Sequence, residues 1–271
     1  PTDMTAILDF VALDGLAFAA ERGKLAGGIP TLRARDLGPA IELGQLAATG
    51  LLPEPERANW LHLGGLGMLY QAIASGRTYW VCPNGRCLGF LRTGARPPAD
   101  EATWVGFGLA AQQAAAAIGF PSKIAAQLAA ALGELHSNIY EHSDASATGL
   151  VVFRAVPSRF EFVVADRGIG VLESLRSCAD YARINDHGEA LRLTLTDGVS
   201  RYGAGTSHGH GFRPLFIGLA NLSGSLRFRS GDHSLVIDGS NPSLMAARTA
   251  QKPFLKGFVA SVVCANTNSP Q

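Results

Sequence analysis

One amphipathic segment limits what this chain can fold into more than any other. Apolar residues recur at three- and four-residue intervals over residues 124–139, which predicts a helix. Glu134, Asn138 and His142 follow one another four residues apart, so their side chains share one helix face. A carboxylate and a carboxamide one turn apart suit an attacking water and a hard divalent cation such as magnesium, which prefers oxygen ligands.

A second segment follows as an apolar run that ends in an acid and two glycines. Residues 159–164 are rich in valine and phenylalanine and predict a buried strand, and Asp166, Gly168 and Gly170 come directly after it. Glycines at a strand end let the backbone approach a flat ligand closely, while the acid accepts a hydrogen bond. The two segments together predict a ligand site where this helix and this strand meet.

These segments resemble the N box and the G1 box of the GHKL ATPases, the superfamily that includes gyrase and the histidine kinases. A third segment, with Gly205, Gly209 and Gly211, resembles the G2 box, although three residues instead of one separate its first two glycines. The resemblance covers residues 120–265. It implies a Bergerat-type sandwich, in which helices cover one face of a mixed sheet, with ATP and Mg²⁺ bound beside it.

The resemblance also implies a role for each matching residue. Glu134 is expected to be the general base, Asn138 the magnesium ligand, and Asp166 the acceptor for the exocyclic amine of adenine. Guanine presents an acceptor at that position, so Asp166 would also select the base. Gly168 and Gly170 would shape the turn beside it. His142 either faces the phosphates when protonated or balances the dipole at the helix end, and His136 has a structural role by helical phase.

The third box carries a second set of expectations. In the superfamily, residues equivalent to 170–211 form a mobile lid over ATP, and Gly205, Gly209 and Gly211 would cradle phosphate with backbone amides. His208 and His210 would contact phosphate or be solvated. Zinc bound by these two and His233 is disfavoured, because no cysteine or acid has matching spacing. Lys252 and Lys256 precede the last predicted strand, where some relatives sense the γ-phosphate.

Composition excludes several classes of protein. The chain has 271 residues, of which 47% are hydrophobic and 17% charged, and a net charge of +1, which argues against a nucleic-acid or anionic-lipid surface. No apolar run reaches the roughly 20 residues that span a bilayer, and no secretory signal is evident, so a cytoplasmic protein is expected. Four cysteines are expected to be structural, with Cys82 and Cys87 flanking a hairpin turn at Asn84-Gly85.

The first part of the chain predicts a separate unit, a small α/β lobe over residues 1–96. Residues 6–13 predict a strand, 16–25 a helix, 29–32 a strand and 39–48 a helix. This order resembles the C-terminal half of STAS domains, the modules of anti-sigma-factor antagonists. The phosphorylatable serine of those antagonists is missing, because Leu16 and Ala17 follow Asp14-Gly15. A generic lobe for partner binding or dimerisation is the alternative.

The rest of the chain completes an α+β protein. Pro97-Pro98 mark a linker over residues 94–103, and the ATP-binding domain is expected over residues 104–271. After two helices, residues 149–154 and 159–164 predict a hairpin that turns at Pro157-Ser158. Residues 226–229, 234–237 and 257–263 predict three further strands, which gives a sheet with helices on one face.

Two functions follow from these expectations. The first is ATP hydrolysis or phosphoryl transfer, used as a regulatory switch on a protein partner and comparable to the anti-sigma-factor serine kinases; a homodimer is compatible with it. The second is a nucleotide-sensing module with negligible turnover. An autonomous sensor histidine kinase is disfavoured, because His62 lies in no phosphoacceptor motif. A domain that binds no nucleotide is the third possibility.

Overall fold

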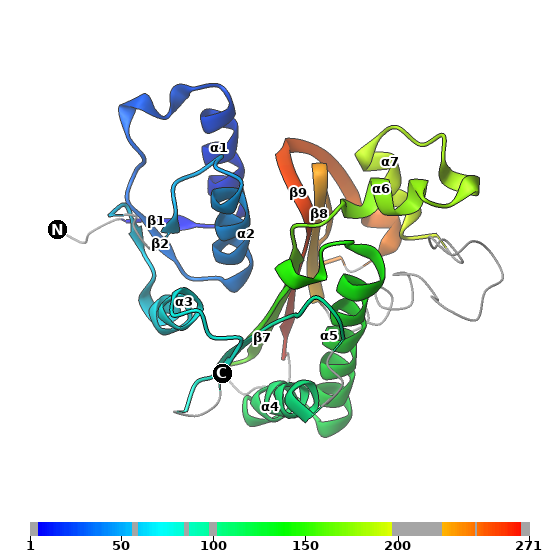
Figure 1. Cartoon of the computed structure of the whole chain (residues 1–271). Helices are drawn as coiled ribbons and strands as arrows, with labels where there is room; N and C mark the ends of the chain where they lie inside the picture. The colour runs from blue at the N-terminus through cyan, green and yellow to red at the C-terminus, as the bar shows by residue number, and fades with distance from the viewer. Residues whose placement is uncertain are drawn as a thin grey trace.

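A sheet of six antiparallel strands forms the centre of the molecule, in the order β4-β5-β6-β7-β9-β8, and a separate parallel sheet has the order β1-β2-β3 (Figure 1). This computed structural model describes residues 5–55, 59–83, 87–97, 102–196, 224–241 and 243–266. The helices are α1 Phe10–Glu21, α2 Leu37–Ala48, α3 Gly67–Ala74, α4 Ala102–Ala117, α5 Ser122–His142, α6 Gly170–Arg176 and α7 His187–Leu193. The strands are β1 Ala6–Leu8, β2 Leu32–Ala34, β3 Leu61–His62, β4 Tyr79–Val81, β5 Leu88–Arg92, β6 Leu150–Val156, β7 Arg159–Asp166, β8 Gly224–Ile237 and β9 Arg248–Ala265.

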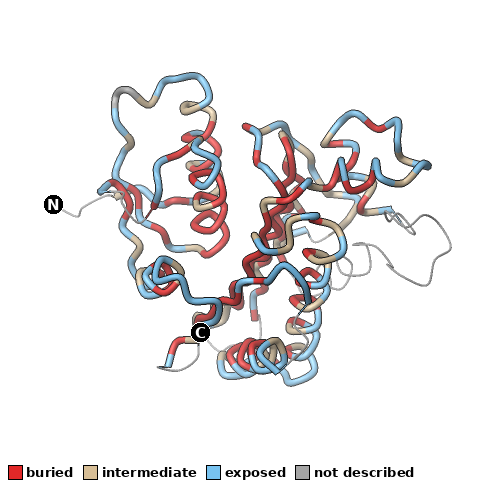
Figure 2. The backbone as a smooth tube through the Cα atoms, in the orientation of Figure 1, coloured by how far each residue is buried: buried red, intermediate tan, exposed pale blue. Residues whose placement is uncertain are grey.

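The chain is therefore α+β, as its sequence predicts, but both faces of the large sheet are covered instead of one. Side chains alternate along each strand, so Val151 and Phe153 of β6 join a core with α4, α5, α6 and α7. Leu150 and Val152 of the same strand join a second core with α1, α2 and α3. Figure 2 shows the sheet buried between these two layers. The described strand pairs of the large sheet are all antiparallel, in place of the expected mixed sheet.

The N-terminal lobe shares this sheet with the rest of the chain. Strands β4 and β5, which the sequence assigns to the first 96 residues, pair with each other and with β6. The hairpin expected between Cys82 and Cys87 is confirmed by the pairing of Val81 with Gly89, although Asn84-Gly85 lies outside the described residues. The segment between β5 and α4 thus joins a strand of the large sheet to a helix that packs in the same core as Leu91 of that strand.

Two predicted boundaries near the N-terminus are wrong. The expected strand over residues 6–13 ends at Leu8, and a helix begins at Phe10 because Asp9 caps it: the Asp9 carboxylate accepts a hydrogen bond of 2.8 Å from the Ala12 amide. The apolar run after Asp9 was compatible with either period, and the cap decides it. Leu16 and Ala17, which replace the expected serine, are buried in the lobe core.

The C-terminal strands are also longer than predicted. Residues 224–237 form one strand, which bends at a bulge around Gly231, and residues 248–265 form another. Polar residues and glycine interrupt both apolar patterns, as at Ser230 to His233 in β8, so the sequence suggested three shorter strands. The hairpin of β6 and β7 is as predicted, with Ser158 at φ 60° in its turn.

Buried charges hold the N-terminal lobe against β8 and β9. Arg227 donates to Asp14 of α1 at 2.6 Å and to Glu42 of α2 at 2.9 Å. Arg229 also pairs with Glu42, and both of these side chains are fully buried. Lys252 of β9 pairs with Asp14 at 2.5 Å, so this candidate phosphate sensor faces the N-terminal lobe instead. We call these five residues the ionic cluster.

A further contact orients α2. The Leu37 amide at the start of this helix donates to the buried carboxylate of Glu161 on β7, at 2.6 Å. Arg159 of the same strand pairs with Glu161 and Asp36, each at 2.7 Å.

Among the described residues, no helix is both long enough and apolar enough to cross a bilayer.

Candidate functional site

Helix α5 presents the three polar side chains that the sequence singled out. It is continuous from Ser122 to His142, with its apolar positions buried against the sheet. Glu134 is exposed on this helix, and Asn138 and His142 are half-buried. The four-residue spacing therefore keeps Glu134 and Asn138 off the apolar face that packs in the core.

Asp166 ends strand β7 on the α5 side of the sheet. Its neighbour Val164 belongs to the core under α5, and alternation places Asp166 on that same side. The Asp166 side chain is 3% exposed and accepts a hydrogen bond of 2.8 Å from the Gly168 amide. Burial raises the pKa of this carboxyl to about 6, and the Gly168 hydrogen bond opposes the rise. A buried carboxylate with one described partner can accept hydrogen bonds from a ligand.

The turn after Asp166 is joined to the end of α5. The Ile169 amide donates to the Ser143 carbonyl at 2.9 Å. A Cβ atom at residue 168 would lie 1.9 Å from the same carbonyl oxygen, so only glycine fits there. The structure thus brings the two predicted segments into direct contact. Ser143 was missed by sequence reasoning, because its role depends on its backbone carbonyl.

Gly170 has a different reason to be glycine. Its φ is +76°, and a Cβ atom would lie 2.7 Å from the Ser230 hydroxyl oxygen. That hydroxyl accepts from the Val171 amide at 2.9 Å and donates to the Gly257 carbonyl at 2.8 Å. Ser230 on β8 and Gly257 on β9 therefore fix the start of α6. No spacing in the sequence linked these distant residues to the Asp166 turn.

The two histidines of α5 differ in environment. His142 lies 3.4 Å from the Ser174 hydroxyl through Nδ1 and 3.8 Å from the Glu141 carboxylate through Nε2. His136 is buried and stacks on Trp104 with ring centroids 3.9 Å apart, and burial lowers its pKa to about 4. The structural role predicted for His136 is confirmed.

Several predicted residues lie outside the described residues. Gly205, Gly209, Gly211, His208 and His210 all belong to the range 197–223. His233, the third residue of the disfavoured zinc site, pairs with Asp232 at 2.8 Å. The described part of the chain contains no group of three or more histidine, cysteine or acidic residues able to hold a metal.

No disulfide bond joins the four cysteines, all of which lie within the described residues. Cys82 and Cys264 are buried, Cys87 is exposed and Cys178 is half-buried. Burial raises the pKa of the Cys264 thiol to about 12, which disfavours the reactive thiolate. These environments agree with structural cysteines at positions 82 and 264.

Comparisons of the chain with models of known protein families, with curated proteins and with solved structures give no match. The residues where α5 meets the turn after β7 are therefore the basis for assigning a function.

Proposed function

We propose that this chain is a Mg²⁺-dependent ATP-binding protein of GHKL type, with a Bergerat-like arrangement of α5, β7 and the turn after it. The observation that carries the proposal is the contact between the end of α5 and the Asp166-Arg167-Gly168-Ile169-Gly170 turn, through Ser143. In support of the proposal, this contact joins the turn after Asp166 to the helix that carries Glu134 and Asn138.

Asp166 is proposed to bind the adenine base. Its buried carboxylate has acceptor capacity beyond the Gly168 amide, and Gly168 and Gly170 let the turn pack closely against Ser143 and Ser230. An exocyclic amine would satisfy that acceptor, whereas the guanine carbonyl would face it with a second acceptor. The raised pKa of Asp166 adds a pH dependence: ATP affinity should decline as the pH falls below about 6, where the carboxyl becomes protonated.

Asn138 and Glu134 are proposed to serve the phosphate end. Asn138 supplies one oxygen ligand to Mg²⁺, and the phosphates and water supply the rest. Glu134, one turn earlier on α5, would orient and deprotonate the attacking water or the acceptor hydroxyl. His142 and the glycines at 205, 209 and 211 complete the proposed phosphate contacts. Hydrolysis or phosphoryl transfer would act as a switch on a protein partner.

The first experiment measures thermal stability with ATP and Mg²⁺. At a ligand concentration of about 100 times Kd, binding should stabilise the chain by ~2.7 kcal/mol. Asp166→Ala should lose this shift, while Asp180→Ala, which removes an exposed carboxylate from the segment after α6, should keep it. Undiminished binding by Asp166→Ala would refute the proposed pocket.

A second measurement separates the enzyme from the alternative. Glu134→Ala should keep ATP affinity and lose phosphate release or transfer. Gln127→Ala, an exposed change on the same helix, should keep both.

One observation favours a nucleotide sensor with negligible turnover. Glu134 is exposed, and no described residue makes a hydrogen bond or ion pair that would orient its carboxylate. A general base needs such positioning to transfer a proton efficiently. Wild-type protein that binds ATP but neither releases phosphate nor labels a protein partner would establish the sensor.

A further inference from the structure

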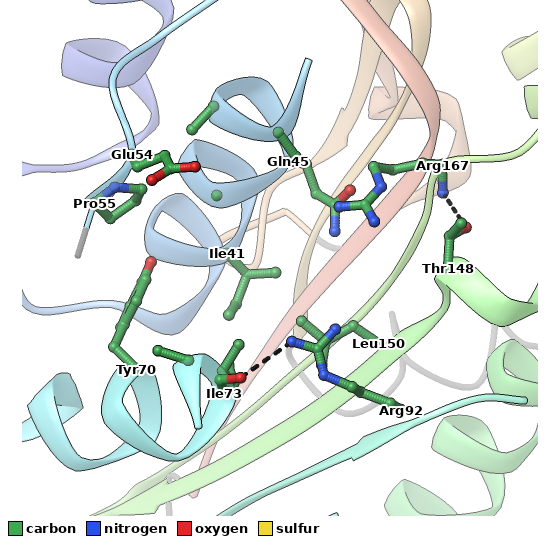
Figure 3. Close-up of a pocket in the computed structure, with 14 residues that line it drawn as sticks. Ile41, Gln45, Glu54, Pro55, Tyr70, Ile73, Arg92, Thr148, Leu150 and Arg167 are labelled. Carbon is green, nitrogen blue, oxygen red and sulfur yellow. Dashed lines mark hydrogen bonds between the residues drawn. The ribbon is translucent and has the colours of Figure 1, made fainter. Parts of the chain in front are cut away.

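A cavity of about 390 Å³ lies on the opposite face of the large sheet, between the sheet and the helices α2 and α3 (Figure 3). Its volume falls within the range of roughly 300–1,000 Å³ that small-molecule sites occupy. Arg92 at the end of β5 and Arg167 after β7 line it from the sheet, and Gln45 lines it from α2. The Asp166 site lies on the other face, so this cavity is distinct from it.

Strand alternation explains why an arginine of the Asp166 turn reaches this side. Val163 and Ala165 of β7 point into the core under α1 and α2, and Arg167 continues that alternation. Its backbone is held by a hydrogen bond of 2.9 Å from the Arg167 amide to the Thr148 hydroxyl. This hydrogen bond fixes the Arg167 backbone, and the Arg167 side chain lines the cavity (Figure 3).

The two arginines give the cavity a positive wall. No described carboxylate forms an ion pair with Arg92 or Arg167, in contrast to the arginines of the ionic cluster. Arg92 donates one long hydrogen bond, 3.3 Å, to the Ile73 carbonyl. Most of the guanidinium donors in the cavity therefore have no acceptor among the described residues, and guanidinium groups bind carboxylate and phosphate oxygens in a fixed geometry.

Gln45 provides an independent indication of a ligand. Its side chain is 6% exposed, and the carboxamide oxygen is enclosed without a hydrogen-bond partner in the described part of the chain. Buried polar groups without partners are rare in folded proteins. Because rotation of the carboxamide exchanges its oxygen and nitrogen, Gln45 can offer an acceptor to a hydroxyl or amine inside the cavity.

We propose that this cavity binds a small organic anion that carries a carboxylate or phosphate and a neighbouring hydroxyl group. The arginines would hold the anionic group, and Gln45 would accept from the hydroxyl. Glu54 on the opposite wall adds a negative charge, which favours a ligand with a single anionic group over a polyanion. The proposal is independent of ATP binding at Asp166.

The test uses the full chain without nucleotide and two probes, glycerol 3-phosphate and L-lactate. Their effect on the melting temperature is titrated at constant ionic strength, with sodium chloride and neutral glycerol as controls. At least one anion should raise the melting temperature in a saturable manner, and glycerol should not. If neither anion exceeds the chloride control, the proposal is wrong.

Three variants locate the binding. Arg167→Met should lower the affinity for the probe about tenfold or more, because a charge-assisted hydrogen bond is lost. Arg92→Met, at an exposed position, provides the same test if Arg167→Met fails to fold. Arg33→Met, which removes an exposed arginine of β2 outside the cavity, should bind normally.

The same titrations distinguish a phosphate ligand from a carboxylate ligand and show which site holds the anion. A response to glycerol 3-phosphate alone assigns a phosphate ligand, and a response to lactate alone a carboxylate ligand. Loss of the response in Asp166→Ala, with both arginine variants unaffected, would place the anion in the other site and overturn the proposal.

Discussion

The two faces of the large sheet are built from different interactions. The face under α4 and α5 is apolar, with Asp166 as a buried acid at its edge. The face under α1 and α2 contains the ionic cluster, in which two carboxylates meet three cations. Buried charges that pair with one another, as in the ionic cluster, hold two parts of the protein together. A buried charge without an ionic partner, such as Asp166, is costly and is typical of a ligand site. The contrast separates the ionic cluster, whose charges are paired within the protein, from Asp166, whose carboxylate is proposed to bind a ligand.

The largest expected effect comes from breaking the ionic cluster. Glu42→Ala leaves Arg227 and Arg229 buried without their shared carboxylate, which should lower the free energy of unfolding by about 3–5 kcal/mol. Urea denaturation at neutral pH measures this change. Glu21→Ala, at an exposed position of α1, should change it by less than about 0.5 kcal/mol. Equal effects of the two substitutions would show that the cluster does not hold the lobe.

A substitution of Asp166 is expected to stabilise the folded protein instead of destabilising it. Its pKa is about 6 in the folded protein and 3.8 as the ordinary value, so the buried charge destabilises the fold above pH 6. Asp166→Asn should therefore raise the free energy of unfolding at pH 7–8 by on the order of 3 kcal/mol. The gain should shrink as the pH falls through 6, and vanish below about 4, where wild type is protonated in both states.

Urea denaturation of Asp166→Asn and wild type at pH 4, 6 and 8 measures this difference. The same variant should bind ATP less well, because an amide cannot replace both carboxylate acceptors. A substitution that stabilises folding and weakens binding is typical of a functional site. A destabilised Asp166→Asn at pH 8 would instead indicate a structural role for the charge.

The smallest effect on stability is expected at Glu134. This side chain is exposed on α5, so Glu134→Ala should change the free energy of unfolding by less than about 0.5 kcal/mol. Any loss of turnover would then reflect chemistry and not folding. A decrease of more than about 1 kcal/mol in the free energy of unfolding would show that Glu134 has a structural role.

The sequence predicted the elements whose signals are local. The period of α5, the hairpin of β6 and β7 and the polar face with Glu134 and Asn138 follow from residues close in the chain. The placement of Asp166 at a strand end was also predictable, because valines and phenylalanines precede it and glycines follow it. The start of α1 was not, because one apolar run fits a strand or a helix until Asp9 is known to cap it.

Only the tertiary structure decided how distant segments meet. Glu42 and Arg227 are 185 positions apart, and nothing local indicates that their charges are buried together. Arg167 lies beside Asp166 in sequence, yet strand alternation sends the two side chains to opposite faces of the sheet. Local spacing fixes which residues share a face of one element, but packing between elements determines which charges find partners and which are left for a ligand.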